Sequence, residues 1–203
     1  MTDTAADGST RQLRRAALWV ALLNLGYFGV EFAVATAIGS VSLFADSVDF
    51  LEDAAVNLLV LVALGWTVRR RAMVGAGLGL LLLLPGIAAA WTAWEKFVEP
   101  VAPAALPLSL AGLGALAVNL TCAVLLARWR HAGGSLSRAA FLSARNDVFA
   151  NVAIIAAGGV TALTLSPWPD LAVGLGILAI NLDAAREVWT AAHREYREGE
   201  LTP

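Results

Sequence analysis

Four carboxylates stand within eight residues of a segment, 41–66, that is otherwise almost entirely apolar. They are Asp46, Asp49, Glu52 and Asp53. In a helix, at about 100° per residue, the three aspartates share one face with Asn57, and Glu52 lies at its margin. An ionised aspartate at a bilayer centre costs about 2.5–3.5 kcal/mol, so this face must meet protein, water or a cation rather than lipid. We interpret it as part of a metal or proton pathway; alternatively, arginine or amide partners elsewhere satisfy the acids.

The composition is that of an integral membrane protein. Of 203 residues, 59% are hydrophobic and 15% are charged, against roughly 25% in soluble domains. The single cysteine, Cys122, excludes an intramolecular disulfide and a cysteine metal cluster. His131 and His193 stand outside the apolar segments, and the basic residues are too few and scattered to form a nucleic-acid-binding face.

Six apolar segments predict an all-α membrane protein with six transmembrane helices. We expect the spans at about 16–39, 41–66, 73–94, 108–126, 139–165 and 171–185. Residues 1–15 are predicted to be a disordered cytoplasmic tail, 16–190 the six-helix transmembrane domain, and 191–203 a short cytoplasmic C-terminal tail. Gly75 and Gly79 have a spacing that lets helices approach closely, although ordinary membrane-helix glycine explains them equally well.

The fifth span carries a second polar stripe, formed by Ser143, Asp147 and Asn151 at intervals of four residues. At 1.5 Å per residue, Asp147 lies about 12 Å from one membrane surface and Asp53 about 18 Å from the other. In a core about 30 Å thick these depths coincide, so we expect the two stripes to converge near the middle of the membrane.

The distribution of basic residues predicts the orientation. Nearly all arginines flank the face shared by the two termini, whereas only Lys96 falls near the other face. By the positive-inside rule both termini are cytoplasmic, in a multi-pass protein that we place in a bacterial inner membrane. Two sets of three spans would have opposite orientations, with a polar stripe on the middle helix of each, as in a 3+3 inverted repeat.

The residues of the second span resemble a family signature. The run Gly-Ser-Val-Ser-Leu-Phe-Ala-Asp-Ser-Val-Asp-Phe-Leu-Glu-Asp at 39–53 is similar to the second helix of the cation diffusion facilitators, which transport divalent metals. Asn24 and Glu31 of the first span and the Pro169-Asp170 opening of the sixth also look like family features. The resemblance covers about 16–190 and implies that Asp49 and Asp53 bind metal.

Two departures from the family pattern bear on the site. The fifth helix of the family usually offers His-x-x-x-Asp, whereas the matching positions here are Ser143 and Asp147. Most members also carry a cytoplasmic ferredoxin-like domain after the sixth helix, and this chain resembles the minority without it. The resemblance therefore implies a site of Asp49, Asp53, Asp147 and Ser143, and the weaker candidates are Asp46, Asn146 and Asn151.

The predicted function is export of a divalent cation from the cytoplasm by alternating access, in exchange for protons that compete for the same oxygens. Carboxylate ligands accept Zn²⁺, and Mn²⁺, Co²⁺, Cd²⁺ and Fe²⁺ remain open. Alternatives are a proton-coupled exporter of small organic cations and a non-transporting membrane scaffold. We expect no enzymatic activity, because no Gly-x-Gly-Asp protease pattern accompanies the acids. We expect no prosthetic group, and a homodimer formed through the transmembrane helices.

Overall fold

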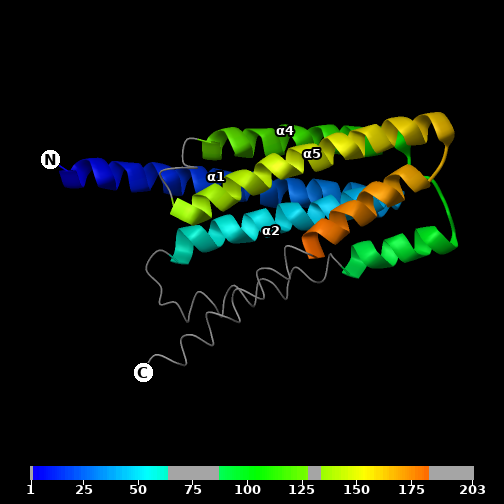
Figure 1. The fold of residues 1–203 in the computed structure, drawn as a ribbon, viewed down its shortest axis with the longest axis horizontal. Helices are drawn as coiled ribbons and strands as arrows, with labels where there is room; N and C mark the ends of the chain where they lie inside the picture. Colours follow the sequence, from blue (N-terminus) through cyan, green and yellow to red (C-terminus); the bar gives the residue numbers. More distant parts are fainter. Residues whose placement is uncertain (1, 64–86, 128–133, 183–203) are drawn as a thin grey trace, which may run out of the picture.

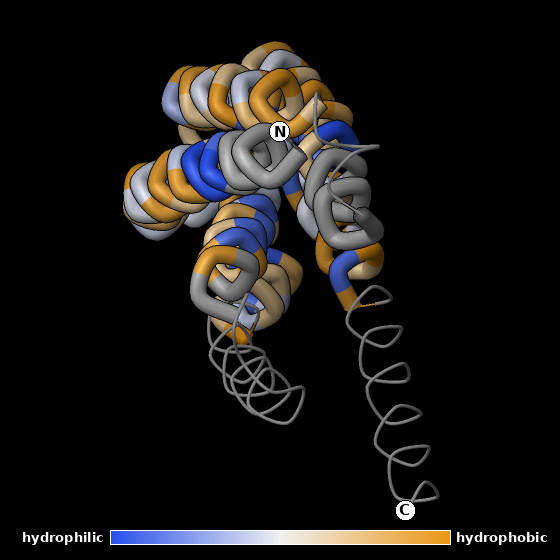
Figure 2. Tube along the Cα trace, turned by 90° about the vertical axis from the view of Figure 1, so that its left-hand side faces the viewer, coloured by the Kyte–Doolittle hydropathy of each residue, from blue (hydrophilic) through white to orange (hydrophobic). Residues whose placement is uncertain are grey.

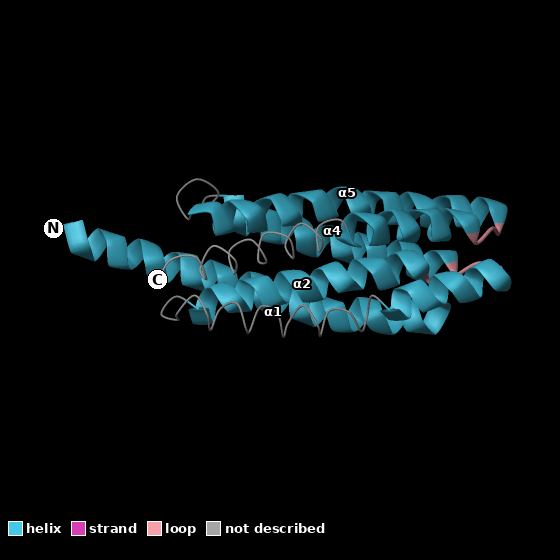
Figure 3. Cartoon of the chain, turned by 60° about the horizontal axis from the view of Figure 1, so that its bottom comes forward, coloured by secondary structure: helices cyan, strands magenta, loops and turns pink. Residues whose placement is uncertain are grey.

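Every regular element in the described residues is a helix. The computed structural model describes residues 2–63, 87–127 and 134–182 (Figures 1 and 3). In chain order its helices are α1 (Thr2–Ile38), α2 (Val41–Ala63), a helix over 87–98, α4 (Ala105–Ala127), α5 (Gly134–Thr164) and a helix over Trp168–Leu182. The prediction of an all-α membrane protein with six helices is confirmed. Most of the predicted third span, including Gly75 and Gly79, and the predicted tail 191–203 lie outside the described ranges.

Helix α1 extends beyond the predicted first span. It begins at Thr2 and includes residues 2–15. No proline occurs between Thr2 and Ile38 to remove a donor and interrupt the series of helical hydrogen bonds.

Several helices match the dimensions of a bilayer. Arg11–Ile38, Ala105–Ala127 and Ser143–Thr164 are long and apolar enough to cross a membrane, by length and composition. Helix α2, with 23 residues, has a length of about 34 Å, but it carries four acids. Large apolar side chains such as Trp19, Leu113 and Phe149 are exposed, as expected of surfaces that face lipid. Hydrophobic residues occur on every described helix (Figure 2).

Helix packing creates an interior in which polar groups are held between apolar layers. Helix α4 packs along α5 and α1 packs along α2, while α2 also contacts α5 (Figure 1). One core cluster includes Leu43, Leu108 and Ile154, which are fully buried. The Tyr27 hydroxyl donates to the Ala111 carbonyl at 2.6 Å and so joins α1 to α4. The acidic helix α2 is therefore enclosed by neighbours on the side that carries its aspartates.

The start of α2 is fixed by a tight turn and a serine cap. Gly39 has a φ of 63°, and the Ser40 N–H donates to the Ala35 carbonyl at 3.1 Å, which closes α1 with a left-handed residue. The Ser40 Oγ then accepts the Leu43 N–H at 3.2 Å, as an N-cap does. We call the end of the bundle that carries this turn, with 99–104 and 165–167, the distal end.

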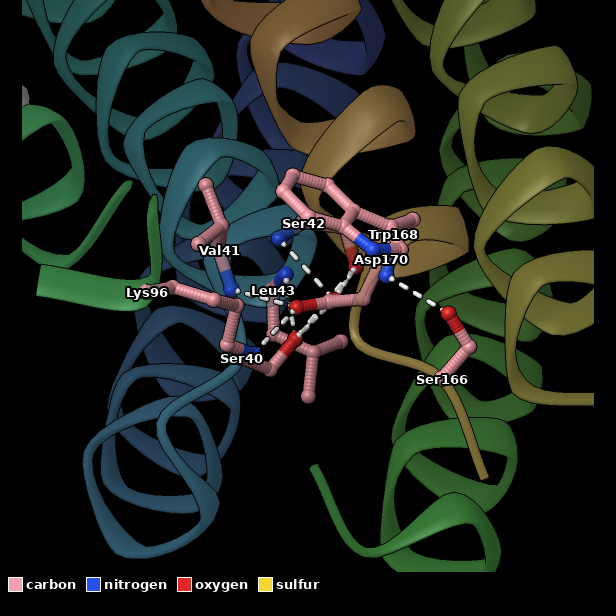
Figure 4. A network of polar contacts seen from close by, with 8 residues as sticks. All are labelled: Ser40, Val41, Ser42, Leu43, Lys96, Ser166, Trp168 and Asp170. Carbon is pink, nitrogen blue, oxygen red and sulfur yellow. Dashed lines mark hydrogen bonds and ion pairs between the residues drawn. The ribbon is translucent and has the colours of Figure 1, made fainter. Parts of the chain in front are cut away.

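Asp170 completes this cap from another helix (Figure 4). Its carboxylate accepts the backbone N–H groups of Val41 at 2.9 Å and Ser42 at 3.2 Å, and the Ser40 and Ser42 hydroxyls at 2.7 and 2.6 Å. Lys96 donates to the same carboxylate at 2.8 Å in a buried ion pair. A negative charge at a helix N-terminus is favourable. Helices 87–98 and Trp168–Leu182 are thus joined to the first turn of α2.

Candidate ion-binding site

The acids of α2 face the interior of the bundle. Asp46 is fully buried, Asp53 and Asn57 are buried, and Asp49 and Glu52 are half-buried. The Asn57 amide donates to the Asp53 carbonyl within the helix at 2.8 Å. The stripe predicted from spacing therefore meets protein rather than lipid, as the energetic argument required.

Helix α5 meets this stripe at two levels. Near the middle of α2, the Ser143 hydroxyl donates to Asp53 Oδ1 at 3.0 Å. Closer to the distal end, Asn151 Nδ2 donates to Asp46 Oδ2 at 2.5 Å. Seven residues separate the two aspartates and eight separate their partners, which is the register of antiparallel helices in contact. The distance between the levels is about 10–12 Å along the helices.

Asp49 and Asp147 lie between these levels and interact electrostatically. The charge of Asp49 interacts with those of Asp147, Asp46 and Asp53, and Asp147 interacts with Asp53 and Asp46 in turn. Both side chains are half-buried. Among the described residues, no three acidic, histidine or cysteine side chains are gathered closely enough to hold a metal ion. The acids thus form a column with hydrogen-bonded ends rather than a closed coordination shell.

The weaker candidates divide between the inside and the outside of the bundle. Asn151 is fully buried, and its Oδ1 accepts Asn119 Nδ2 at 3.0 Å, so its donor nitrogen is directed at Asp46. Asn146 is exposed and accepts Arg145 Nη2 at 3.3 Å. The structure therefore brings Asn151 to the acids of α2 and leaves Asn146 beside Arg145 on the outer face.

Three buried polar residues of α1 and α4 border the column and were not among the candidate ligands. Asn24 and Glu31 are fully buried on α1, and Cys122 Sγ contacts Asn24 Oδ1 at 3.7 Å. Glu31 interacts electrostatically with Asp46 and Asp49, and Cys122 with Asp53 and Asp147. A sequence signal existed for two of them, because Asn24 and Glu31 are seven residues apart and share a face of α1.

Comparison with known proteins assigns the family. The model of the cation efflux transmembrane domain matches residues 17–192. The chain belongs to the cation efflux family. This confirms the resemblance to the cation diffusion facilitators that the second span indicated. No curated protein matches the sequence.

Membership of the cation efflux family defines the general activity. The family comprises transporters rather than enzymes, and it moves metal ions without a prosthetic group. This cation efflux protein is accordingly a membrane-embedded cation transporter, and its buried acidic column lies inside the matched domain.

Proposed function

We propose that the protein exports a divalent transition-metal ion from the cytoplasm, binding it at Asp49, Asp53 and Asp147 with Ser143 completing the shell. The observation that carries this proposal is the Ser143–Asp53 hydrogen bond, because it joins the acidic face of α2 to the stripe of α5. The chemistry of the side chains, carboxylates and a hydroxyl, supports ligation by oxygen, and Zn²⁺ is our first choice, with Mn²⁺, Co²⁺, Cd²⁺ and Fe²⁺ as alternatives.

Transport of this kind requires the site to open alternately to each side of the membrane. The acids of α2 are enclosed by α1, α4 and α5. At the distal end, the hydrogen bonds of Asp170 join α2 to the helix over Trp168–Leu182. Support for proton coupling comes from the enclosure itself, because clustered carboxylates inside the bundle need a cation or protons as compensation once the metal leaves. We therefore propose metal/proton antiport, with both termini in the cytoplasm of a bacterium.

Uptake into proteoliposomes tests the function. Purified protein is reconstituted, and uptake of Zn²⁺, Mn²⁺, Co²⁺, Cd²⁺ and Fe²⁺ is measured together with the internal pH. We expect metal entry with proton movement in the opposite direction. Uptake of tetramethylammonium without metal would favour the organic-cation exporter, and absence of any uptake would favour a scaffold. Metal entry without a change in pH would remove the antiport mechanism alone.

The site is tested by isosteric neutralisation. Asp53→Asn and Asp147→Asn are each expected to abolish metal uptake, because each removes a charged ligand from a site that has no histidine in reserve. Glu95→Gln is the matched control, since Glu95 accepts Trp91 Nε1 at 2.7 Å at an exposed position and has no part in the column. Normal uptake by a monodisperse Asp53→Asn protein would refute the proposed site.

A further inference from the structure

The upper part of the acidic column, towards the distal end, contains an unusual pair of carboxylates. Glu31 of α1 and Asp46 of α2 are both fully buried and interact directly with each other. Among the described residues, no donor reaches either oxygen of Glu31 or Oδ1 of Asp46, and the two carboxyl groups lie within hydrogen-bond range of each other, whereas Asp46 Oδ2 accepts Asn151 Nδ2. Buried carboxylate oxygens without a donor are rare, because their desolvation is not compensated.

The donors nearest to this pair are directed elsewhere. The Tyr27 hydroxyl, which interacts electrostatically with both acids, donates its proton to the Ala111 carbonyl at 2.6 Å. Ser47, next to Asp46 in sequence, donates to the Phe44 carbonyl at 2.7 Å. Asn119 donates to Asn151 and so fixes the Asn151 amide with its nitrogen towards Asp46. The described residues thus supply one amide donor to the four oxygens of the two carboxyl groups.

A cation is the ligand that suits this arrangement. Three oxygens from two helices, which accept no hydrogen bond from another described side chain, provide negative charge in a buried place, where a divalent ion neutralises both carboxylates at once. All of these possible metal ligands are oxygen atoms, which favour hard ions such as Mn²⁺ and also bind Zn²⁺. Asn151 stabilises Asp46 from the side and leaves the face towards Glu31 free.

The pair also lies close enough to the proposed transport site to interact with its acids. Asp49 interacts electrostatically with Asp147 and Asp53 on one side and with Asp46 and Glu31 on the other. Asp46 is five residues from the distal start of α2, about 7.5 Å, whereas Asp53 is about 18 Å from it. An ion leaving the lower acids therefore meets Glu31 and Asp46 one step nearer to the distal end.

We propose that Glu31 and Asp46 form a second divalent-cation site, which receives the transported ion from the Asp49–Asp53–Asp147 site on its way to the distal end. This inference rests on the proposed function. It differs from that function in predicting two ions per chain and in giving α1 a ligand.

Counting bound Mn²⁺ tests the second site. Wild type, Glu31→Gln, Asp53→Asn and Glu95→Gln proteins in lipid nanodiscs are titrated with MnCl₂, and bound Mn²⁺ is measured by electron paramagnetic resonance and calorimetry. We expect two ions per chain in wild type and in Glu95→Gln. We expect one ion in Glu31→Gln and one in Asp53→Asn, each with the affinity of the site that remains.

Asp46→Asn provides a second route to the same result, and size-exclusion chromatography shows whether each variant is folded. Unchanged Mn²⁺ number and affinity in Glu31→Gln would overturn the second site, including the case in which the pair holds a proton instead. A wild type that transports metal but binds one ion would overturn the second site and leave the function intact. Two bound ions without any uptake would support the site and refute the export function.

Discussion

Ser143 is the weakest metal ligand among the side chains proposed to surround the transported ion. Its hydroxyl is neutral, and in the structure it donates to Asp53 at 3.0 Å rather than offering a charge of its own. The identity of this single side chain should therefore influence which metals the protein prefers.

Replacing Ser143 by histidine should shift selectivity from Mn²⁺ towards Zn²⁺ and Cd²⁺. Imidazole is a nitrogen ligand that these softer ions favour. Its unperturbed pKa of about 6.5 also lets it exchange a proton for metal near neutral pH, so the pH dependence of uptake should change. Calorimetric titration of wild type and Ser143→His with both metals at pH 6 and pH 7.5 measures this.

Ser143→Ala is the control for this substitution. It removes the hydrogen bond to Asp53 without adding a ligand, and it should not acquire the preference for Zn²⁺. Equal Zn²⁺ affinity in wild type and Ser143→His would show that position 143 does not face the ion.

Some residues of the column could be predicted from sequence and others could not. The stripes on α2 and α5 follow from spacing and from the cost of charge in a membrane, so their contact was expected. The pairing of Asp170 with Lys96 does not follow from sequence, because the two residues are 74 positions apart and hydropathy marks Lys96 only as a charge beside an apolar segment. A signal was present, since Lys96 is the only lysine in the chain.

At the scale of the elements, the ion pair between Lys96 and Asp170 joins two helices at the distal end, and the hydrogen bonds of Asp170 join both to α2. Removing the lysine as Lys96→Met leaves a buried carboxylate without its counter-charge, which typically costs about 3–5 kcal/mol. We expect a corresponding loss of stability in detergent, measured by chemical or thermal unfolding followed by tryptophan fluorescence.

The neighbouring Glu95→Gln should change stability by less than about 0.5 kcal/mol, because Glu95 is exposed. In the double variant Lys96→Met with Asp170→Asn, the buried charge is removed from both sides. The double variant should lose less stability than the sum of the losses in Lys96→Met and Asp170→Asn. Strictly additive losses would contradict a direct interaction between the two side chains.

A close approach of backbones lies beside this network. A Cβ atom added at Gly174 would lie 2.7 Å from the Ser42 nitrogen and the Val41 carbonyl carbon, which cannot move independently of α2. Gly174→Ala should therefore destabilise the protein by about 1–3 kcal/mol through overpacking.

Gly176 offers a matched control on the same helix. A Cβ there meets no atom of the described residues within 4 Å, so Gly176→Ala should be neutral or slightly stabilising through helix propensity. Equal melting temperatures for the two alanine variants would mean that the helix over Trp168–Leu182 is not held against α2 as described.

Several helix ends agree with the ends of the apolar segments, because membrane thickness limits the length of a helix and of its apolar segment alike. The start of α2 at Val41 and the end of α1 near Gly39 agree with the predicted spans. Helix α4 and the helix over Trp168–Leu182 each begin three residues earlier than predicted, and α5 begins five residues earlier. At Trp168 the early start coincides with a local cap that hydropathy does not report, because the Trp168 N–H donates to Ser166 Oγ at 3.4 Å.

On the scale of the whole molecule, the proposed orientation predicts which surfaces reach each side of the membrane. In a Cys122→Ser background, Ala104→Cys at the distal end should react with a membrane-impermeant maleimide in intact cells. Gln12→Cys, beside Arg11, Arg14 and Arg15, should react only after permeabilisation, because basic residues remain on the cytoplasmic side. Both substituted positions are exposed. The opposite labelling pattern would show that the protein has the reverse orientation in the membrane, and it would contradict the proposed direction of transport.

Because α2 is held at its first turn by Asp170, a tilt of this helix would be centred on that turn. Because Asp53 lies about 18 Å from Val41, a tilt of about 10° around the anchor would move Asp53 by about 3 Å and the far end at Ala63 by about 6 Å. Asp46, close to the pivot, would move by only about 1 Å. Ligand distances near Asp53 would therefore change by more than a coordination bond tolerates, while those near Asp46 would be almost preserved.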